Sequence, residues 1–199
     1  KEKYLSNSYK KYNIWFLIDK LDEIVDESDP DNDLPQIVHS YQTALSIKNN
    51  YLENKNLKNI PIKNLFGKNE WDSLPEKYKN EYNTTLNDYY KNITKWDWFP
   101  LVGFIHDLGK IMLLDNFGCL PQWSVVGDTF PLQKKLSSNF VFYDKLYHLK
   151  NKDIIKDSNN KKGFENFHFS WGHDEFLAKT LEMNNTNLPE EAIYLIRYH

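Results

Sequence analysis

The sequence predicts an all-α protein, and three observations carry that prediction. Apolar residues recur at intervals of three and four in most long segments, which is the spacing of one helix face. Residues that start helices, such as Asp33 and Ser170, precede several of these segments. No run alternates apolar and polar residues as a half-buried strand would. At 199 residues the chain suits one domain with its own core, so we expect a single domain over residues 1–199.

Two helices are predicted in the first quarter of the chain. The first covers residues 11–25, and its apolar face consists of Ile14, Trp15, Ile18, Leu21, Ile24 and Val25. The acidic, turn-forming stretch DESDPDND at residues 26–33 follows it. A second helix then runs to about residue 48, with Asp33 as its cap and Pro35 in its first turn. We expect His39 to lie close to the buried side of this helix.

Residues 49–95 differ in composition from the rest of the chain. They are rich in Asn, Lys and Tyr and poor in aliphatic residues, so we interpret them as an insertion. A helix over residues 78–93 is expected, with its tyrosines turned inward. No function is assigned to this insertion.

A strongly apolar stretch over residues 98–112 contains His106 and Asp107 side by side. We expect one helix here. Burying an imidazole and a carboxylate among apolar residues is costly unless something compensates, and a bound cation would satisfy both groups. The alternative is a helix end whose His and Asp face water, which is the commoner outcome for an isolated His-Asp pair.

The remaining segments alternate between loops and helices. Residues 116–131 are dense in Gly, Pro and aromatic residues and are expected to form an ordered loop packed on the core. Residues 145–162 are polar and are expected to be a mobile surface connection. A helix capped by Ser170 should run to Met183, and a last one should begin at the Leu188-Pro189 pair and continue to His199.

Charge and composition exclude several classes of partner. A net charge of −3 and a pI near 6.1 offer no basic surface for nucleic acid and no polybasic membrane anchor. No apolar run is long enough to span a bilayer, and the first residues lack the features of a secretory signal. The single cysteine, Cys119, is compatible with a reducing compartment, so we expect a cytoplasmic protein. The chain lacks an initiator Met and stops inside a predicted helix, so we expect truncation at both ends.

Six histidines provide the candidate metal ligands. His148 is expected to be a solvated surface residue, and His168, between two phenylalanines, to be a packed or capping residue. Taken singly, each of the other four would be a hydrogen-bonded core histidine. The four lie on separate predicted helices that must share one core, and they are His39, His106, His173 and His199.

Together with Asp107, these four imidazoles make a nitrogen- and oxygen-rich donor set. Such a set suits iron, manganese or zinc and is poorly suited to calcium. A carboxylate can bridge two metal ions a few Å apart, so a two-metal centre is a reasonable hypothesis. The absence of thiolate ligands argues against iron-sulfur chemistry, and His/carboxylate ligation with open positions is typical of iron that activates oxygen.

Five blocks in order resemble the myo-inositol oxygenase family. They are DESDPDNDLP at residues 26–35 with HSYQTA at 39–44, the stretch at 98–110, PQWSVVGDTFP at 121–131, SWGHDE at 170–175, and residues 188–199. The His-Asp pair alone would indicate only the broader HD-domain superfamily, to which that family is similar in fold. The resemblance therefore implies an HD-domain-like helical bundle. It covers most of the chain outside residues 49–95 and 145–162.

The resemblance also implies an activity and a set of site residues. A non-haem centre of two Fe ions would use O₂ to cleave myo-inositol to D-glucuronate, within a single catalytic domain. His39, His106 and Asp107 would hold one iron, and Asp107 would bridge to a second iron held by His173 and His199. Lys110 would face the substrate as a fixed positive charge that stabilises a bound alkoxide. The positions matching those that contact sugar hydroxyls in the family are Asp26, Asp29, Gly127 and Asp128.

Other interpretations of these residues stay open. Asp26 and Asp29 could end a helix and shape a turn, Asp128 could cap a turn, and Lys110 could be a solvated cation. The family has a further carboxylate ligand beyond the last histidine and an arginine on an N-terminal arm, and this chain has neither. An HD-type metal-dependent phosphohydrolase and an inactive fragment without the last ligand are therefore alternatives. We expect a monomer.

Overall fold

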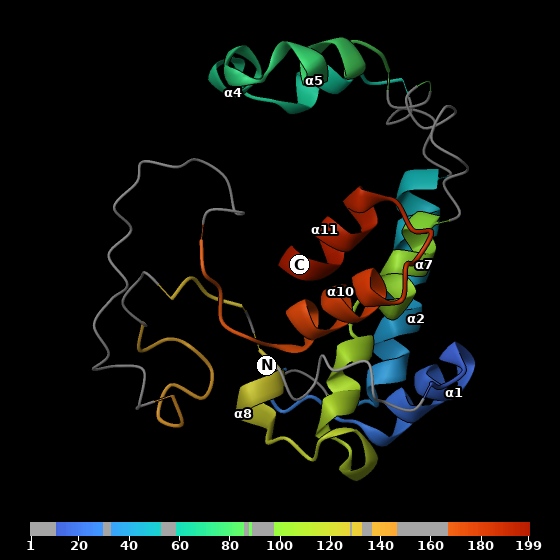
Figure 1. Ribbon diagram of the computed structural model, residues 1–199, viewed down its shortest axis with the longest axis vertical. Helices are drawn as coiled ribbons and strands as arrows, with labels where there is room; N and C mark the ends of the chain where they lie inside the picture. Colours follow the sequence, from blue (N-terminus) through green and yellow to red (C-terminus); the bar gives the residue numbers. More distant parts are fainter. Residues whose placement is uncertain are drawn as a thin grey trace. The chain divides into compact units, whose positions relative to one another are not determined.

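The computed structural model describes residues 11–29, 33–52, 59–85, 88, 98–127, 129–132, 137–146 and 167–199 (Figure 1). In these residues the regular elements are helices, with no strand beyond isolated bridges, so the predicted all-α class is confirmed. The chain forms two compact units. The first contains Lys1–Ser40 and Ile105–His199, and the second contains Tyr41–Phe104. The single domain over 1–199 stays a prediction, and the second unit includes the predicted insertion at 49–95.

The predicted helix over 11–25 is shorter than expected. It consists of α1 (Ile14–Asp19) followed by the 3-10 turn η2 (Lys20–Glu23). Asn13 caps α1, because its side chain accepts a hydrogen bond from the Trp15 backbone at 2.8 Å. The middle part of the apolar stripe, with Ile18, Leu21 and Ile24, is buried, whereas Trp15 is 64% and Val25 40% exposed. Only this part of the stripe therefore anchors the segment in the core of the first unit.

Helix α2 (Gln36–Ile47) begins in the first unit and continues into the second. Pro35 immediately precedes it and forms an antiparallel bridge with Val25. The Gln36 backbone N–H donates to the Ile24 carbonyl at 2.8 Å. These contacts hold the start of α2 against the segment that leads into the acidic stretch, which brings His39 and Asp26 into the same region.

The stretch over 98–112 is not one continuous helix, contrary to the prediction. Helix α7 (Trp98–Ile105) ends before His106, the His106-Asp107 pair forms a turn, and the 3-10 helix η5 (Leu108–Leu113) follows. At Gly109, η5 packs closely against the start of α10, where an added Cβ would lie 2.0 Å from the carbonyl oxygen of His173. Close packing against the start of α10 fixes the path of η5 and overrides the helical pattern of the sequence.

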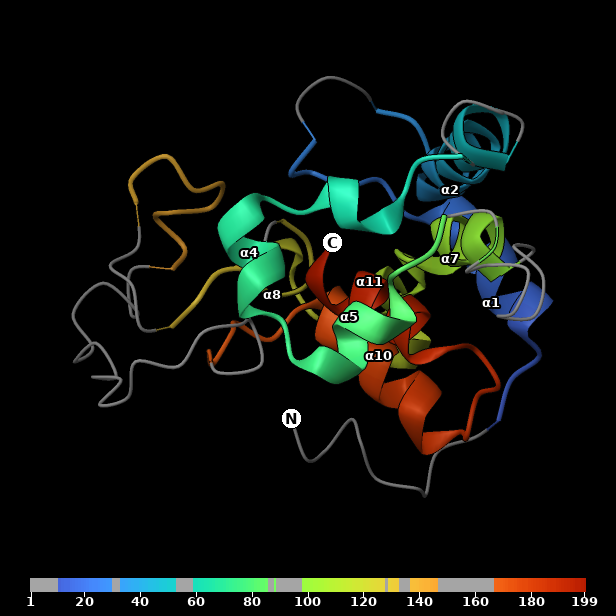
Figure 2. The ribbon, with the colours of Figure 1, turned by 90° about the horizontal axis from the view of Figure 1, so that it is seen from above.

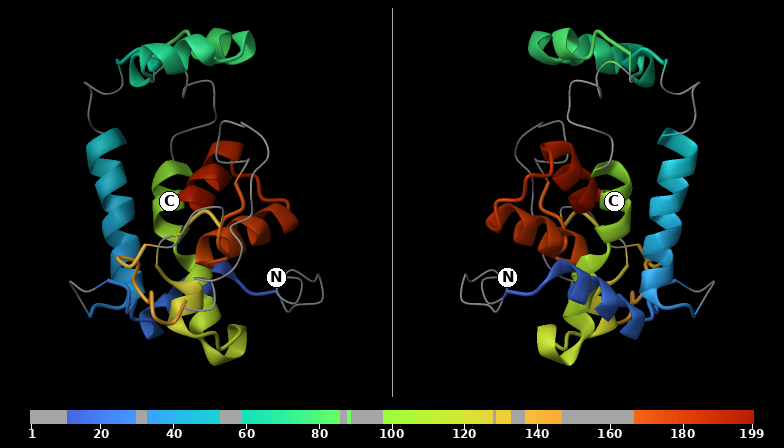
Figure 3. Two further views of the ribbon diagram at one scale, coloured as in Figure 1. Left: turned by 90° about the vertical axis from the view of Figure 1, so that its left-hand side faces the viewer. Right: turned by 90° about the vertical axis from the view of Figure 1, so that its right-hand side faces the viewer.

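The C-terminal part of the first unit is a helix pair on a small apolar core. Helices α10 (His173–Met183) and α11 (Glu190–Tyr198) lie side by side in two different views (Figures 1 and 3). Helix α10 begins at His173 with Gly172 as its N-cap, two residues later than predicted. Ser170 instead accepts a hydrogen bond from the Phe130 backbone at 3.1 Å. The predicted loop over 116–131 contains the end of η6 (Asp115–Phe117) and α8 (Gln122–Val125), and part of it packs on Met112.

The second unit contains short helices around an aromatic cluster. They are η4 (Ile62–Leu65), α4 (Lys68–Ser73) and α5 (Glu76–Glu81), seen from above in Figure 2, and the π-helical turn η3 (Lys48–Leu52) follows α2. Phe66 lies between Trp71 and Tyr82, with ring centroids 5.8 and 6.0 Å away. The predicted helix over 78–93 forms only at its start, because residues 78–81 belong to α5, which ends at Glu81, and residues 82–85 are not helical. Residues 86–87 and 89–97 lie outside the described part. No described helix has the length and apolar character needed to cross a bilayer.

Candidate metal centre

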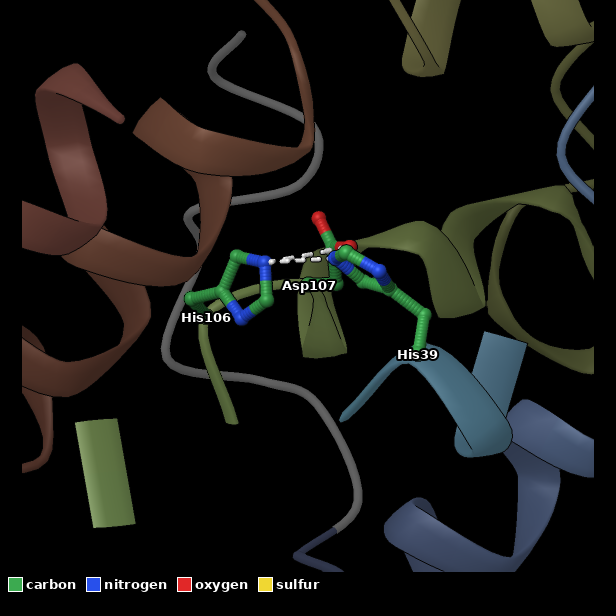
Figure 4. Close-up of side chains that lie close together, drawn as sticks. All are labelled: His39, His106 and Asp107. Atoms are coloured by element: carbon green, nitrogen blue, oxygen red, sulfur yellow. Dashed lines mark hydrogen bonds and ion pairs between the residues drawn. The ribbon is translucent and has the colours of Figure 1, made fainter. Parts of the chain in front are cut away.

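Asp107 lies at the centre of the site, in the turn that follows α7. Its side chain is only 3% exposed, although it carries a charge. Figure 4 shows its carboxylate with the imidazoles of His39 and His106 pointing toward it. The two carboxylate oxygens of Asp107 face two different pairs of histidines.

The Oδ2 atom of Asp107 faces the first histidine pair. The Nε2 atoms of His39 and His106 lie 3.5 and 3.3 Å from Oδ2, and they are 3.3 Å from each other. His106 comes from the turn itself, whereas His39 comes from the first turns of α2. The His39 side chain is 51% exposed, so its predicted position close to the buried side is wrong. His39 reaches the site from the exposed edge of the cavity, because the first turns of α2 face Asp107.

The Oδ1 atom of Asp107 faces the second histidine pair. The Nε2 atoms of His173 and His199 lie 3.0 and 3.5 Å from Oδ1 and 3.2 Å from each other. Both rings are oriented by backbone carbonyls, because His173 Nδ1 lies 2.7 Å from the Val125 oxygen and His199 Nδ1 lies 2.7 Å from the Ile196 oxygen. A carbonyl only accepts, so each Nδ1 carries the hydrogen. In the neutral rings each Nε2 therefore presents a lone pair.

This arrangement fits a pair of metal ions. Two imidazole lone pairs that face each other across 3.2 Å beside a carboxylate repel one another unless a cation or a proton lies between them. Within the described residues, two groups of three donors have ligand atoms within 4.8 Å of one another: His39, His106 and Asp107, and Asp107, His173 and His199. Asp107 belongs to both groups through different oxygens, which is the geometry of a bridging carboxylate.

The surroundings of the site shift the pKa values of three candidate metal ligands. Burial would raise the pKa of Asp107, but the polar contacts with His106, His173 and His199 and the charge of Lys110 lower that pKa well below its ordinary value. Partial burial lowers the pKa of the half-exposed His39, which favours the neutral imidazole that binds metals. Burial also acts to lower the pKa of His199, but the hydrogen bond and charge of Asp107 outweigh it and raise that pKa. A proton and a metal ion therefore compete for His199.

Lys110 contributes a buried positive charge next to the carboxylate. Among the described residues, its Nζ lies 2.7 Å from Asp26 Oδ2, 3.0 Å from Asp107 Oδ2 and 3.2 Å from Gln36 Oε1. Burial would raise the pKa of Asp26, but the charge and hydrogen bond of Lys110, with the hydrogen bonds of Ser28, lower it. Lys110 is thus held by the fold and is not the solvated cation of the alternative interpretation.

The metal centre opens into a cavity of about 490 Å³, a volume typical of small-molecule sites. Besides the four histidines, Asp107 and Lys110, its lining includes Asp26, Ser28, Gly127, Thr129, Phe169 and Tyr198. Asp26 accepts hydrogen bonds from the backbone and hydroxyl of Ser28 at 2.8 and 2.6 Å. Thr129 donates a hydrogen bond to the buried carboxylate of Asp174, the residue after His173. The cavity therefore combines a floor of candidate metal ligands with walls that are partly polar and partly aromatic.

Some predicted residues reach the cavity and others do not. Gly127 lines it with a φ of +85°, a backbone conformation that favours glycine. Asp29 is exposed and outside the lining, and Asp128 lies outside the described residues, as does His148. His168 is described but is not part of the cavity lining.

The sequence prediction missed several residues of the site. They are Gln36, Ser28, Thr129, Phe169, Asp174 and Tyr198. Ser28, Thr129, Asp174 and Tyr198 lie within two residues of predicted positions, so a scan of the neighbours in the motifs could have found them. Gln36 and Phe169 carried no signal, because their roles depend on contacts across the fold.

Fold and site together define a helical protein with a candidate two-metal centre of four histidines and one bridging carboxylate. The chain matches the family described as myo-inositol oxygenase over residues 1–69 and 76–199. It is 36% identical over 204 residues to the inositol oxygenase of Mus musculus, covering 98% of this chain and 55% of the relative. It is 34% identical over 197 residues to the inositol oxygenase of Dictyostelium discoideum, covering 95% of this chain and 53% of the relative. Inositol oxygenase 1 of Arabidopsis thaliana is 33% identical over 207 residues, covering 100% of this chain and 52% of the relative.

The chain belongs to the myo-inositol oxygenase family, as its sequence blocks predicted. It spans about half the length of the curated relatives that it matches.

Proposed function

We propose that this chain carries the catalytic site of an inositol oxygenase, which uses O₂ to cleave the ring of myo-inositol to D-glucuronate. The observation that carries the proposal is the carboxylate of Asp107 between two pairs of histidine Nε2 atoms, beside the Lys110 ammonium and at the base of one cavity. Membership of the family supports the same activity.

We propose that the centre holds two iron ions. His39, His106 and Asp107 Oδ2 would bind one, and His173, His199 and Asp107 Oδ1 would bind the other. When bound, the iron pair supplies activation of O₂ and polarisation of the substrate oxygens. The Val125 and Ile196 carbonyls keep His173 and His199 in the tautomer that points Nε2 at the site.

Lys110 is the candidate catalytic residue beside the metal ligands. Its ammonium is fixed between Asp26 and Asp107, close to where a hydroxyl of the substrate would bind at the centre. A hydroxyl oxygen that loses its proton gains negative charge, and a preorganised cation stabilises that charge without rearrangement. Asp107 would thus both hold the metal ions and help to hold the cation in place.

The polar walls are suited to a polyol. Both oxygens of Asp26 are oriented, one by Ser28 and the other by Lys110, and a carboxylate has further lone pairs to accept a hydrogen bond from a substrate hydroxyl. A stereoisomer with one hydroxyl displaced would leave such a buried acceptor without its donor, which disfavours its binding. By resemblance to the family, we include Asp29, Gly127 and Asp128 among the proposed substrate contacts.

The test uses the purified protein that contains this chain, loaded anaerobically with Fe(II). We expect O₂ consumption that depends on myo-inositol and yields glucuronate. A protein that binds two irons but produces no glucuronate would contradict the proposal. Release of phosphate from nucleotides would favour a phosphohydrolase, and an absence of stoichiometric metal would favour a silent binding domain.

Two variants connect the activity to the centre. Asp107→Asn should lose both metal ions and all turnover, because the bridging charge disappears. Asp115→Asn changes an exposed aspartate on the same segment and should keep the wild-type metal content. Equal metal content in the two variants would contradict the assignment of Asp107 as the bridge. A cytoplasmic, monomeric protein stays a prediction, which cell fractionation and analytical ultracentrifugation would check.

A further inference from the structure

Gln36 is a buried polar residue next to the metal centre that has no role in the function proposed above. It is the first residue of α2, one helical turn before His39, and it is 4% exposed. Its backbone N–H is fixed by the Ile24 carbonyl at 2.8 Å. Its side chain extends to Asp107 and Lys110, so backbone and side chain are both held.

Both ends of the Gln36 amide are used. Nε2 donates to Asp107 Oδ2 at 2.6 Å, and Oε1 accepts from Lys110 Nζ at 3.2 Å. The opposite orientation of the amide would place its oxygen against the carboxylate and its NH₂ group against the ammonium, and both contacts would be repulsive. The charges around it therefore select one orientation.

This amide restricts the rotation of the Asp107 carboxylate. Two donors, Gln36 and Lys110, approach Oδ2 within 3.0 Å. With Oδ2 fixed in this way, Oδ1 faces His173 at 3.0 Å. A carboxylate that could rotate freely would not keep one oxygen in front of each histidine pair.

We propose that Gln36 is a positioning residue, which sets the rotation of the Asp107 carboxylate so that one oxygen serves each metal ion, and which holds Lys110 beside it. This rests on the proposed two-metal function. A side chain that positions a ligand in this way typically changes metal affinity 10- to 100-fold when it is removed. The Gln36 amide donates to Asp107 and accepts from Lys110 without carrying a charge. It therefore adds no third negative charge beside Asp26 and Asp107.

Two substitutions separate the functions of the amide. Gln36→Met removes the donor and the acceptor while keeping a side chain of similar length. Gln36→Glu keeps an acceptor for Lys110 but removes the donor to Asp107. Gln42→Met is the matched control, because Gln42 is an exposed glutamine on the same helix.

The measurement is titration of the metal-free protein with Co²⁺, followed by calorimetry and by the visible absorption of the bound ion. We expect Gln36→Met and Gln36→Glu to bind Co²⁺ about 10- to 100-fold more weakly at the Asp107-dependent sites, with altered spectra. In the iron-loaded enzyme, kcat should fall more than KM rises for inositol. Gln42→Met should match the wild type in all three readouts.

The outcomes distinguish this proposal from the proposed function. Wild-type affinity and spectrum in both Gln36 variants would overturn the positioning role, whether or not the enzyme turns over inositol. Two bound ions in the wild type without turnover would contradict the oxygenase function. The Co²⁺ titration of the Gln36 variants would still test the positioning role in that case. Circular dichroism checks folding. If Gln36→Met does not fold, Gln36→Asn, whose amide is one methylene too short, replaces it with the same expected loss.

Discussion

Lys110 and its carboxylate neighbours form a charged group that the first unit encloses almost completely. The side chains of Asp26, Asp107 and Lys110 are at most 12% exposed. Charges removed from water in this way are tolerable only as a set, because each compensates for the desolvation of the others. The loss of one member should therefore cost far more than the loss of a surface ion pair.

Lys110→Met should lower the free energy of unfolding of the metal-free protein by about 3–5 kcal/mol, because it leaves two buried carboxylates without their cation. Urea denaturation measures the change. The matched control is Lys179→Met, which breaks the partly exposed Lys179–Glu182 pair and should cost less than about 1 kcal/mol. Similar losses in the two variants would show that the Lys110 group is not desolvated as described.

The pH dependence of stability should carry the signature of Asp26. Its pKa in the folded protein lies below the ordinary value of 3.8, since Lys110 and Ser28 outweigh the effect of burial. Ionised Asp26 therefore stabilises the fold above pH 3.8, and this contribution is lost as the pH falls through the lowered pKa. Asp26→Asn should be less stable than the wild type near pH 7, and the difference should shrink under acid. Denaturation at several pH values tests this, and a difference that grows on acidification would contradict it.

At the scale of elements, the contact between η5 and the start of α10 sets the geometry of the second histidine pair. Gly109 on η5 touches the His173 backbone, and His173 is both the first residue of α10 and a candidate ligand. No space remains for a Cβ at this contact. The closeness of these two backbones positions His173 Nε2 over Asp107 Oδ1.

Gly109→Ala should destabilise the protein by several kcal/mol and weaken metal binding, because the new methyl group would separate η5 from α10. Thermal unfolding and Co²⁺ titration measure the two effects. Gly103→Ala is the control, because its Cβ would meet the mobile end of the Ile47 side chain at 2.5 Å, which can move away. A Gly109→Ala protein with wild-type metal affinity would contradict the role of this contact.

A second inter-element contact joins α10 to α11. Arg197 on α11 donates to Glu175 and Glu182 on α10, each at 2.7 Å, and the Arg197 and Glu175 side chains are mostly buried. His199 follows Arg197 by two residues. The ion pair therefore fixes the end of α11 next to the histidine pair.

Arg197→Met should lower the free energy of unfolding by about 1.5–3 kcal/mol, because it removes charge-assisted hydrogen bonds from a partly buried position. A double-mutant cycle with Glu175→Gln, measured by urea denaturation, isolates the pair. We expect clear coupling between the two substitutions. Additive effects would show that Arg197 stabilises the helix pair by packing alone.

At the scale of the whole molecule, the candidate metal centre connects segments that are far apart in the sequence. Its ligands come from α2, the turn after α7, α10 and the residue after α11, and all of them lie in the first unit. Ions that bind only the folded chain stabilise it by mass action. The centre should therefore contribute to stability as well as to chemistry.

Addition of Co²⁺ at about 100 times its dissociation constant should stabilise the folded protein by roughly 2.7 kcal/mol per site, and a chelator should reverse the effect. Scanning calorimetry measures the rise in Tm. Asp107→Asn should show no comparable rise, because it lacks the shared ligand. An equal rise in both proteins would place the stabilising ions somewhere else.

The helical class and the donor chemistry of the candidate centre follow from the sequence alone. Apolar spacing predicts helices because burial of one face requires that period, and the four histidines with Asp107 provide a metal-binding donor set wherever the chain brings them together. These properties depend on residue types and short-range spacing, which can be read without coordinates.

The arrangement of the donors, in contrast, depends on the packing of the folded chain. This packing ended α7 before His106, placed His39 at an exposed rim, divided the Asp107 oxygens between two histidine pairs and brought Gln36 against both Asp107 and Lys110. Each of these features is a contact between segments at least tens of residues apart or a consequence of one, such as the packing of Gly109 on His173. Local sequence does not encode such distances, because they follow from how the helices pack.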